Sequence, residues 1–276
     1  MKAALAVAAA SLPLLASATE PLTCAGPAFG TTYRVTLSRE TPAHPIAAVH
    51  REVEAVIARI HLAVHRSDRI DRAASTWRDD SDATRFNRAA AGEWVDVGQD
   101  LVVIVEVARR VHEASDGAFD VAVDRDAAAR PGMGTIESRP SPPGLRKTRP
   151  GVTLDLGGIG PGYAVDAVGA RLVELGSSDH LVELGGEVRA WGRRSDRDAW
   201  RVRVGSGRHV IDMVPGTAIA TSTARPGLSP VDPRSGMVIE CRSASATVRH
   251  LSCAEADAWA VAALVRGLQA GPDGVI

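Results

Sequence analysis

Two groups of residues in the C-terminal half have types and spacing that suit chemistry on a phosphate. The first is the run G-G-I-G-P-G at residues 157–162, which lies between a strand-like and a helix-like pattern. Missing side chains let a ligand approach the backbone, and the N–H groups at the start of a helix face an anion. The second is Asp257, a carboxylate among small and apolar residues near the end of the chain. Mg²⁺ binds one or two carboxylates and backbone oxygens beside substrate phosphates. The glycine run and Asp257 together therefore predict a Mg²⁺ site beside a phosphate.

Each feature also has a plainer explanation. Glycine is the default residue where the backbone needs a positive φ, so the glycine run is equally consistent with a tight turn. Asp257 is equally consistent with a carboxylate that faces solvent. Ser252 and Glu255 have the spacing of a capping box, which predicts that Glu255 is occupied at the start of the last helix.

The glycine run also allows a nucleotide-binding interpretation. Gly158, Gly160 and Gly162 are one residue short of the G-x-G-x-x-G dinucleotide fingerprint, and the acidic residue at the end of the next strand would be Glu183. A dinucleotide-binding oxidoreductase is therefore kept as an alternative.

The composition is that of an ordinary globular enzyme or binding protein. Apolar residues make up 45% of the 276 residues and charged residues 24%, which argues against disorder. The formal net charge is −1, so the chain lacks the basic surface that nucleic acids or anionic membranes attract.

The first 18 residues are predicted to be a signal peptide. Lys2 precedes an uncharged apolar run, and A-S-A at residues 16–18 is a cleavage signal that places the mature start near Thr19. We expect export to a bacterial periplasm and a mature chain that does not span a membrane. Of the cysteines, Cys24, Cys241 and Cys253, at most one pair is able to form a disulfide, so a Cys241–Cys253 bridge and buried thiols both stay open.

Periodicity indicates the elements that must position these groups. Strands are expected at 29–37, 152–156 and 180–184 and in further short segments up to residue 249. Helices are expected at 46–64, 99–114 and 163–175 and from about residue 254. The Pro- and Gly-rich stretch 124–151 is interpreted as a surface loop or a seam between two lobes.

Seven motifs in order resemble those of the FAD:protein FMN transferases, the ApbE family. The most specific are D-G-A-F-D at 116–120 and D-L-G-G-I-G-P-G-Y-A-V-D at 155–166. The others are F-G-T-T-Y at 29–33, the S-T-W-R-D-D-S loop from 75 with R-F-N at 85–87, L-G-G-E at 184–187, A-T-S at 220–222 and D-P-R-S-G at 232–236. The resemblance covers nearly the whole mature chain, residues 19–276.

The resemblance implies a fold, a reaction and a set of site residues. The fold would be α+β, a two-lobed, T-fold-related domain with antiparallel or mixed sheets and packed helices. The reaction would be Mg²⁺-dependent transfer of FMN from FAD to a Thr hydroxyl of an acceptor protein, a redox subunit, with release of AMP. Metal ligands would be the carbonyl of Gly158 and the carboxylate of Asp257. Flavin contacts would fall on Phe29, Trp77, Ala118, Phe119, Asp120 and Asp155.

Three positions depart from the family pattern. Pro161 replaces a Lys of the glycine loop, Ser229 replaces a His that is a candidate base, and Val261 replaces a Thr that would be a metal ligand. A general base contributes roughly 10²–10⁴ in rate, so slow catalysis is expected. The alternative within the same fold is a weakened or inactive FAD-binding member.

Overall fold

The computed structural model describes residues 22–38, 44–64, 81–124, 132–194, 198–204, 209–224, 229–239 and 244–268. The predicted signal peptide, Trp77 and Cys241 lie outside these residues. No helix in the described ranges is both long and apolar enough to cross a membrane. Cys253 is a buried free thiol, as is Cys24, in line with the buried-thiol alternative for these two residues.

A six-stranded sheet forms the larger lobe, with the strand order β1-β2-β8-β9-β12-β13 and antiparallel pairing throughout. Its strands are β1 (Leu22–Ala28), β2 (Thr31–Leu37), β8 (His180–Leu184), β9 (Glu187–Trp191), β12 (Ala218–Ala224) and β13 (Ala244–His250). Alternate residues point to opposite faces of such a sheet. Val182 and Leu184 therefore face one layer, while Val188 and Ala190 face the other.

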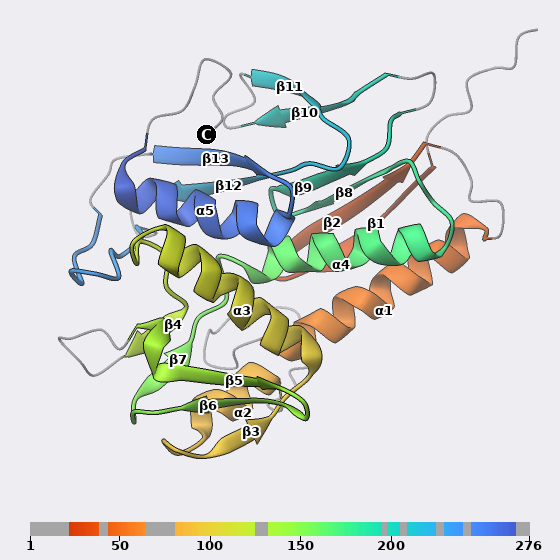
Figure 1. Ribbon diagram of the computed structural model, residues 1–276. Coiled ribbons are helices and arrows are strands. Elements are labelled where there is room, and N and C mark those ends of the chain that lie inside the picture. Colours follow the sequence, from red (N-terminus) through yellow and green to blue (C-terminus); the bar gives the residue numbers. More distant parts are fainter. Residues whose placement is uncertain are drawn as a thin grey trace, which may run out of the picture.

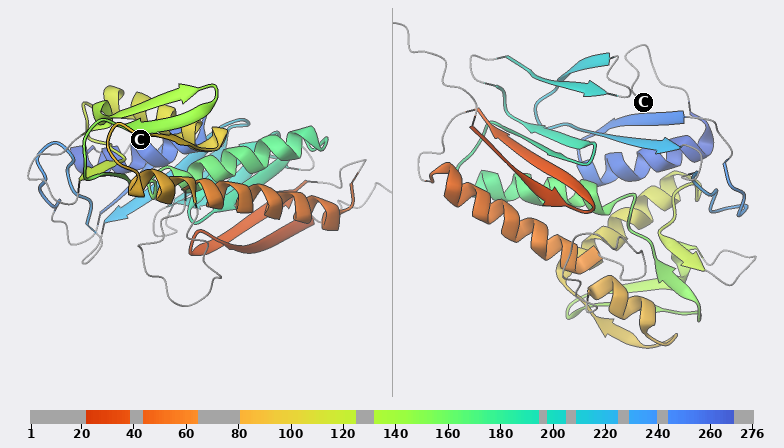
Figure 2. Two further views of the ribbon diagram at one scale, coloured as in Figure 1. Left: turned by 90° about the horizontal axis from the view of Figure 1, so that it is seen from below. Right: turned by 180° about the vertical axis from the view of Figure 1, so that it is seen from behind.

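Helices cover one face of this sheet, as Figure 1 shows from the front and Figure 2 from two other sides. The helices are α4 (Gly160–Glu174) and α5 (Cys253–Arg266) against the strands, with α1 (Ile46–Val64) and α3 (Gln99–Ala114) packed on them. The predicted α3 matches the structure residue for residue. Its apolar side, with Leu101, Ile104, Val105 and Ala108 fully buried, holds it in the core.

The opposite face of the sheet carries a separate hairpin. Strands β10 (Trp200–Val204) and β11 (His209–Met213) pair with each other. Trp200 and Met213 from the hairpin pack on Val188 and Ile219 of the sheet in a second small core.

The smaller lobe contains the region that the sequence predicted as a loop. It comprises α2 (Asp82–Arg88), β3 (Trp94–Asp96), β4 (Ala122–Asp124), η1 (Met133–Thr135), β5 (Ile136–Pro140), β6 (Pro143–Lys147) and β7 (Val152–Leu154). The loop prediction is wrong for residues 133–147, because β5 and β6 form a hairpin that β3 extends to three strands. Lys147 is buried there and donates to the carbonyls of Asn87 (2.9 Å) and Val152 (3.0 Å).

Two other sequence expectations need correction. Phe29 and Gly30 are not strand residues: both have positive φ and form the tight turn between β1 and β2. The dinucleotide-binding alternative requires parallel strands on both sides of the glycine run. Here β7 pairs antiparallel with β4, while β8 lies in the six-stranded sheet, so this arrangement is absent from the described strands.

Stability should fall in mild acid because of His180, which is fully buried beside Ser177 and stacked on Trp191 with ring centroids 4.7 Å apart. Burial lowers the pKa of His180 from 6.5 to about 4. The unfolded chain therefore takes up the proton first, and stability present above pH 6.5 is lost as the pH falls toward 4. We expect His180→Gln to remove roughly 3 kcal/mol of the difference in unfolding free energy between pH 7 and pH 4, measured by urea denaturation. An unchanged pH dependence would contradict this role of His180.

Candidate active site

The glycine run, the loop at 116–120 and helix α5 meet at one point. A Cβ placed on Gly158 would lie 2.9 Å from Cγ2 of Val261 and 3.5 Å from Cε2 of Phe119. Three motifs that are far apart in the sequence are thus in contact. The side chain of Val261 occupies the space beside Gly158 without offering an oxygen.

Glycine is needed in this run for close packing. Residues 157–159 form a turn, but Gly158, Gly160 and Gly162 are absent from the residues with positive φ, so a positive φ is not the reason for glycine at these positions. A Cβ on Gly162 would lie 2.4 Å from the carbonyl oxygen of Cys253, which no neighbouring backbone tolerates. Helix α4 also begins at Gly160, earlier than its apolar pattern predicted. The glycines therefore let α4 and α5 touch at their first turns.

Asp257 is a buried carboxylate at this contact. It is 6% exposed, which excludes the explanation that it faces solvent. Its Oδ2 accepts the backbone N–H of Gly162 at 3.2 Å, so it lies at the N-terminus of α4. Burial and the neighbouring Glu187 raise the pKa of Asp257 well above its ordinary value. A carboxylate in this position requires a positive partner if it is to be ionised at neutral pH.

Glu187 is a second buried carboxylate, which sequence reasoning did not assign to the site. It is 8% exposed, and burial raises its pKa to about 7. A Cβ on Gly185 would lie 3.2 Å from Oε2 of Glu187 and 2.9 Å from Cγ2 of Thr31. The L-G-G-E motif therefore joins the opening G-T-T-Y strand beside Asp257. The signal in the sequence was an acidic residue directly after two glycines.

The residues present fit a hard divalent cation. Two buried carboxyl groups interact electrostatically, and the nearby Arg189 is bound to Asp166 at 2.6 Å. The described residues hold no group of three or more His, Cys, Asp or Glu able to enclose a metal. Mg²⁺ does not require such a group, because it is typically bound by one or two carboxylates with its other positions taken by water and phosphate oxygens. Gly158 would add a backbone carbonyl, while Val261 adds nothing.

The loop at 116–120 is fixed beside the glycine run. Ala118 and Phe119 are buried, so the backbone of this loop is the part available to a ligand. Asp120 accepts the N–H of Ala122 at 2.7 Å and lies 3.4 Å from Nδ1 of His112. The same ring nitrogen is 3.0 Å from the carbonyl oxygen of Phe119. These contacts place all three predicted flavin residues of the loop in one rigid turn.

Asp155 and Phe29 approach the same region from other elements. The N–H of Asp155 donates to Val121 at 2.8 Å, and its carboxylate accepts the N–H of Gly157 at 3.1 Å. Phe29 lies on the β1–β2 turn, with its ring 5.4 Å from that of His61 in α1. Asp155 thus lies between the loop at 116–120 and the start of α4, whereas the ring of Phe29 contacts α1. Trp77 is outside the described residues.

The turn at 232–236 packs on the loop at 116–120. A Cβ on Gly117 would lie 3.4 Å from Cγ of Arg234, whose guanidinium pairs with Asp232 at 2.9 Å. Ser229 is half-buried and lies just before the bridge between Val231 and Val238. The D-P-R-S-G and D-G-A-F-D motifs are therefore neighbours, with Ser229 at the start of the same segment.

The capping box at the start of α5 is only half formed. Oγ of Ser252 accepts the N–H of Glu255 at 3.3 Å, as expected. The carboxylate of Glu255 instead binds Arg110 at 2.9 Å and lies 3.3 Å from His250. Glu255 is therefore a surface ion-pair residue.

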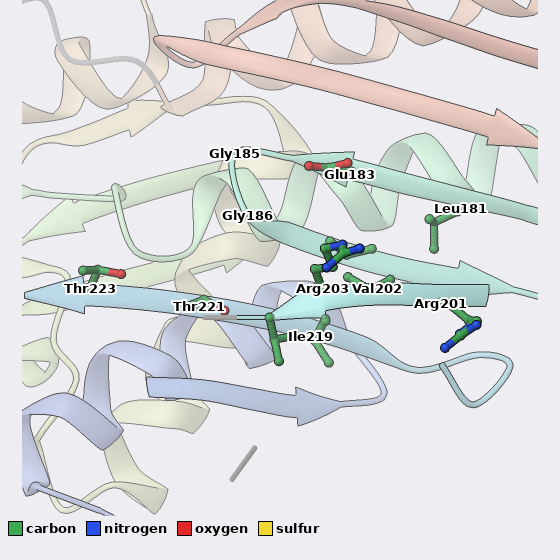
Figure 3. A pocket seen from close by; sticks show the side chains of 12 residues that line it. Leu181, Glu183, Gly185, Gly186, Arg201, Val202, Arg203, Ile219, Thr221 and Thr223 are labelled. Atoms are coloured by element: carbon green, nitrogen blue, oxygen red, sulfur yellow. The ribbon is translucent and has the colours of Figure 1, made fainter. Parts of the chain in front are cut away.

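An open groove of about 440 Å³ lies on the opposite face of the six-stranded sheet (Figure 3). Its floor includes Glu183 and Thr221, and its wall is β10 with Arg201 and Arg203. None of the predicted flavin or metal residues that the structure describes lines it. Glu183, the acidic residue of the dinucleotide interpretation, thus faces away from the glycine run.

Comparisons with known proteins agree with the motif order. A family model described as the ApbE family matches residues 29–275. The FAD:protein FMN transferase of Vibrio cholerae is 29% identical, over 96% of this chain and 88% of the relative. That of Haemophilus influenzae is 24% identical, over 94% and 84%. The apo crystal structure of Pseudomonas stutzeri flavinyl transferase ApbE is similar with a TM-score of 0.75 and 27% identity, covering 90% of this chain and 86% of that one.

Proposed function

The chain belongs to the ApbE family, and from that premise we propose that it is an FAD:protein FMN transferase. The observation that carries the proposal is the meeting of Phe119, Gly158 and the α5 helix that bears Asp257, which assembles three family motifs around one buried carboxylate. Curated relatives that match most of the chain are named for this activity. The expected exported location is part of the proposal.

The reaction would transfer FMN from FAD to a Thr hydroxyl of an acceptor protein. A new bond forms between the hydroxyl oxygen and the FMN phosphorus, the pyrophosphate bond breaks, AMP leaves, and the hydroxyl proton is released to water. Asp257 and the Gly158 carbonyl would hold Mg²⁺, whose chemistry when bound is to neutralise the negative charge of the pyrophosphate. The first N–H groups of α4 are already used within the protein, because that of Gly160 donates to the carbonyl of Leu156, that of Gly162 donates to Asp257, and Pro161 has none. Positioning and charge neutralisation carry much of such a transfer, so slow activity is expected without His at 229 or Thr at 261.

The protein should bind FAD before any transfer occurs. We expect titration of FAD with micromolar protein to quench the flavin fluorescence, because the ring would stack on an aromatic side chain, with Trp77 the predicted partner. A Trp77→Ala variant should reduce the quenching, whereas Trp94→Ala in the smaller lobe should not. Absence of any fluorescence change at high micromolar protein would contradict both the transferase and the inactive flavin-binding alternative.

The direct test is incubation with FAD, Mg²⁺ and an acceptor protein, followed by mass spectrometry. Formation of AMP together with an acceptor heavier by one FMN would support the proposal. FAD binding with no AMP and no FMN-bearing acceptor would favour the inactive flavin-binding member instead.

A further inference from the structure

Asp166 joins the two helices that form the candidate metal site. Its carboxylate accepts the backbone N–H groups of Cys253 (3.0 Å) and Ala254 (3.1 Å), and Oγ of Ser252 donates to it at 2.8 Å. Arg189 pairs with it at 2.6 Å. A carboxylate from α4 therefore caps the N-terminus of α5, where the free N–H groups and the helix dipole favour a negative charge.

The contact between the helices is reciprocal. Asp166 of α4 accepts from the first residues of α5, and Asp257 of α5 accepts the N–H of Gly162 in α4 at 3.2 Å. Gly162 and Asp166 are one turn apart, as are Cys253 and Asp257, so the two contacts flank one helix crossing. The close approach at Gly162 leaves no room for a side chain between the two helices.

Arg189 balances the charge of Asp166 and ties the pair to the sheet. Its guanidinium lies 4.7 Å from the ring centroid of Trp191, and that ring fills the space where Gly169 of α4 lacks a side chain. Glu187, Arg189 and Trp191 alternate along β9 and so share the face toward the helices. With four partners, Asp166 has no lone pair directed at a further ligand, in contrast to Asp257.

We propose that Asp166 is a positioning residue that holds the α5 N-terminus so that Asp257 is presented to a divalent cation at the N-terminus of α4. This inference rests on the proposed function, because it assigns Asp257 to the metal of that reaction. Asp166 itself touches neither cation nor flavin. Removal of the Asp166 carboxylate should let the first turn of α5 move, which would reorient the carboxylate of Asp257.

The test compares Mn²⁺ binding with stability in the full exported protein. Asp166→Ala should raise the Mn²⁺ dissociation constant about tenfold, measured by electron paramagnetic resonance, as for other residues that orient a ligand. Asp166→Asn keeps one acceptor oxygen, so its Mn²⁺ dissociation constant should lie between those of the native protein and Asp166→Ala. The control is Ile136→Ala, a change at a buried residue of the smaller lobe. It is expected to lower Tm about as much as Asp166→Ala does, while the Mn²⁺ dissociation constant stays within twofold of the native value.

The outcomes separate this inference from the proposed function. The positioning role would be overturned if Ile136→Ala weakened Mn²⁺ binding as much as the Asp166 variants do. It would also be overturned if both Asp166→Asn and Asp166→Ala bound Mn²⁺ with native affinity. If Asp166→Ala does not fold, reduced Mn²⁺ affinity in folded Asp166→Asn supports the role and native affinity overturns it. Native protein that binds Mn²⁺ but never cleaves FAD would refute only the proposed function. Native protein that binds no Mn²⁺ would refute the positioning role and the metal assignment together.

Discussion

Asp257→Asn is expected to abolish Mg²⁺-dependent FMN transfer, a loss of roughly 100-fold or more, comparable with removal of a main electrostatic group from an active site. Asn has the same shape and can still accept the N–H of Gly162, so the helix contact should survive. It removes the negative charge that would attract the cation. Because burial and Glu187 oppose ionisation of Asp257, the variant should be at least as stable as the native protein when no metal is present.

The same variant should lose stabilisation by the metal. A ligand at 100 times its Kd stabilises the folded state by about 2.7 kcal/mol, so Mg²⁺ should raise the Tm of the native protein but not that of Asp257→Asn. Glu255→Gln is the matched control on the same helix, since its carboxylate serves a surface ion pair with Arg110. An Asp257→Asn protein with native Mg²⁺ dependence would show that Asp257 is no metal ligand.

Strong periodicity made much of the fold predictable. Helix α3 and strand β8 match their predicted bounds, and α1 buries the predicted stripe that includes Val49, Val53 and Ile60. The β5–β6 hairpin was missed because Pro140 and Pro143 looked like loop residues. They pair with each other at the end of the hairpin, where proline fits because its missing N–H is not needed in the ladder.

Most residues of the candidate site could be named from the sequence, but the contacts that join them could not. Motif order pointed to the glycine run and the 116–120 loop, and Asp257 was predicted from its place among small and apolar residues. The contacts of Asp166 with Cys253 and of Gly162 with Asp257 join residues 87 and 95 positions apart, and no local pattern encodes them. The two glycines before Glu187 were a signal for this position, but its burial could not be predicted because it depends on how β9 packs against α5.

Restoring the two missing polar groups should raise the rate of FMN transfer. We expect the double variant Ser229→His with Val261→Thr to be faster than the native protein by an order of magnitude or more, because it supplies a base and a hydroxyl ligand. Val261 already packs against Gly158, so a Thr of the same shape places its hydroxyl at that backbone. Ser229 begins the described segment 229–239, whose Arg234 packs on Gly117.

The single variants and one control divide this gain between the two groups. Val261→Thr alone should tighten Mg²⁺ binding, whereas Val265→Thr, one turn further along α5, adds a hydroxyl away from Gly158 and should not. Ser229→His alone should make the transfer rate rise with pH through the range near 6.5 in which histidine loses its proton, since a base acts in its neutral form. Transfer rates are read from AMP release and from the mass of the acceptor. If the double variant binds FAD and Mg²⁺ but releases no more AMP than the native protein, the slow step does not depend on these two groups, and the departures at 229 and 261 are not what limits catalysis.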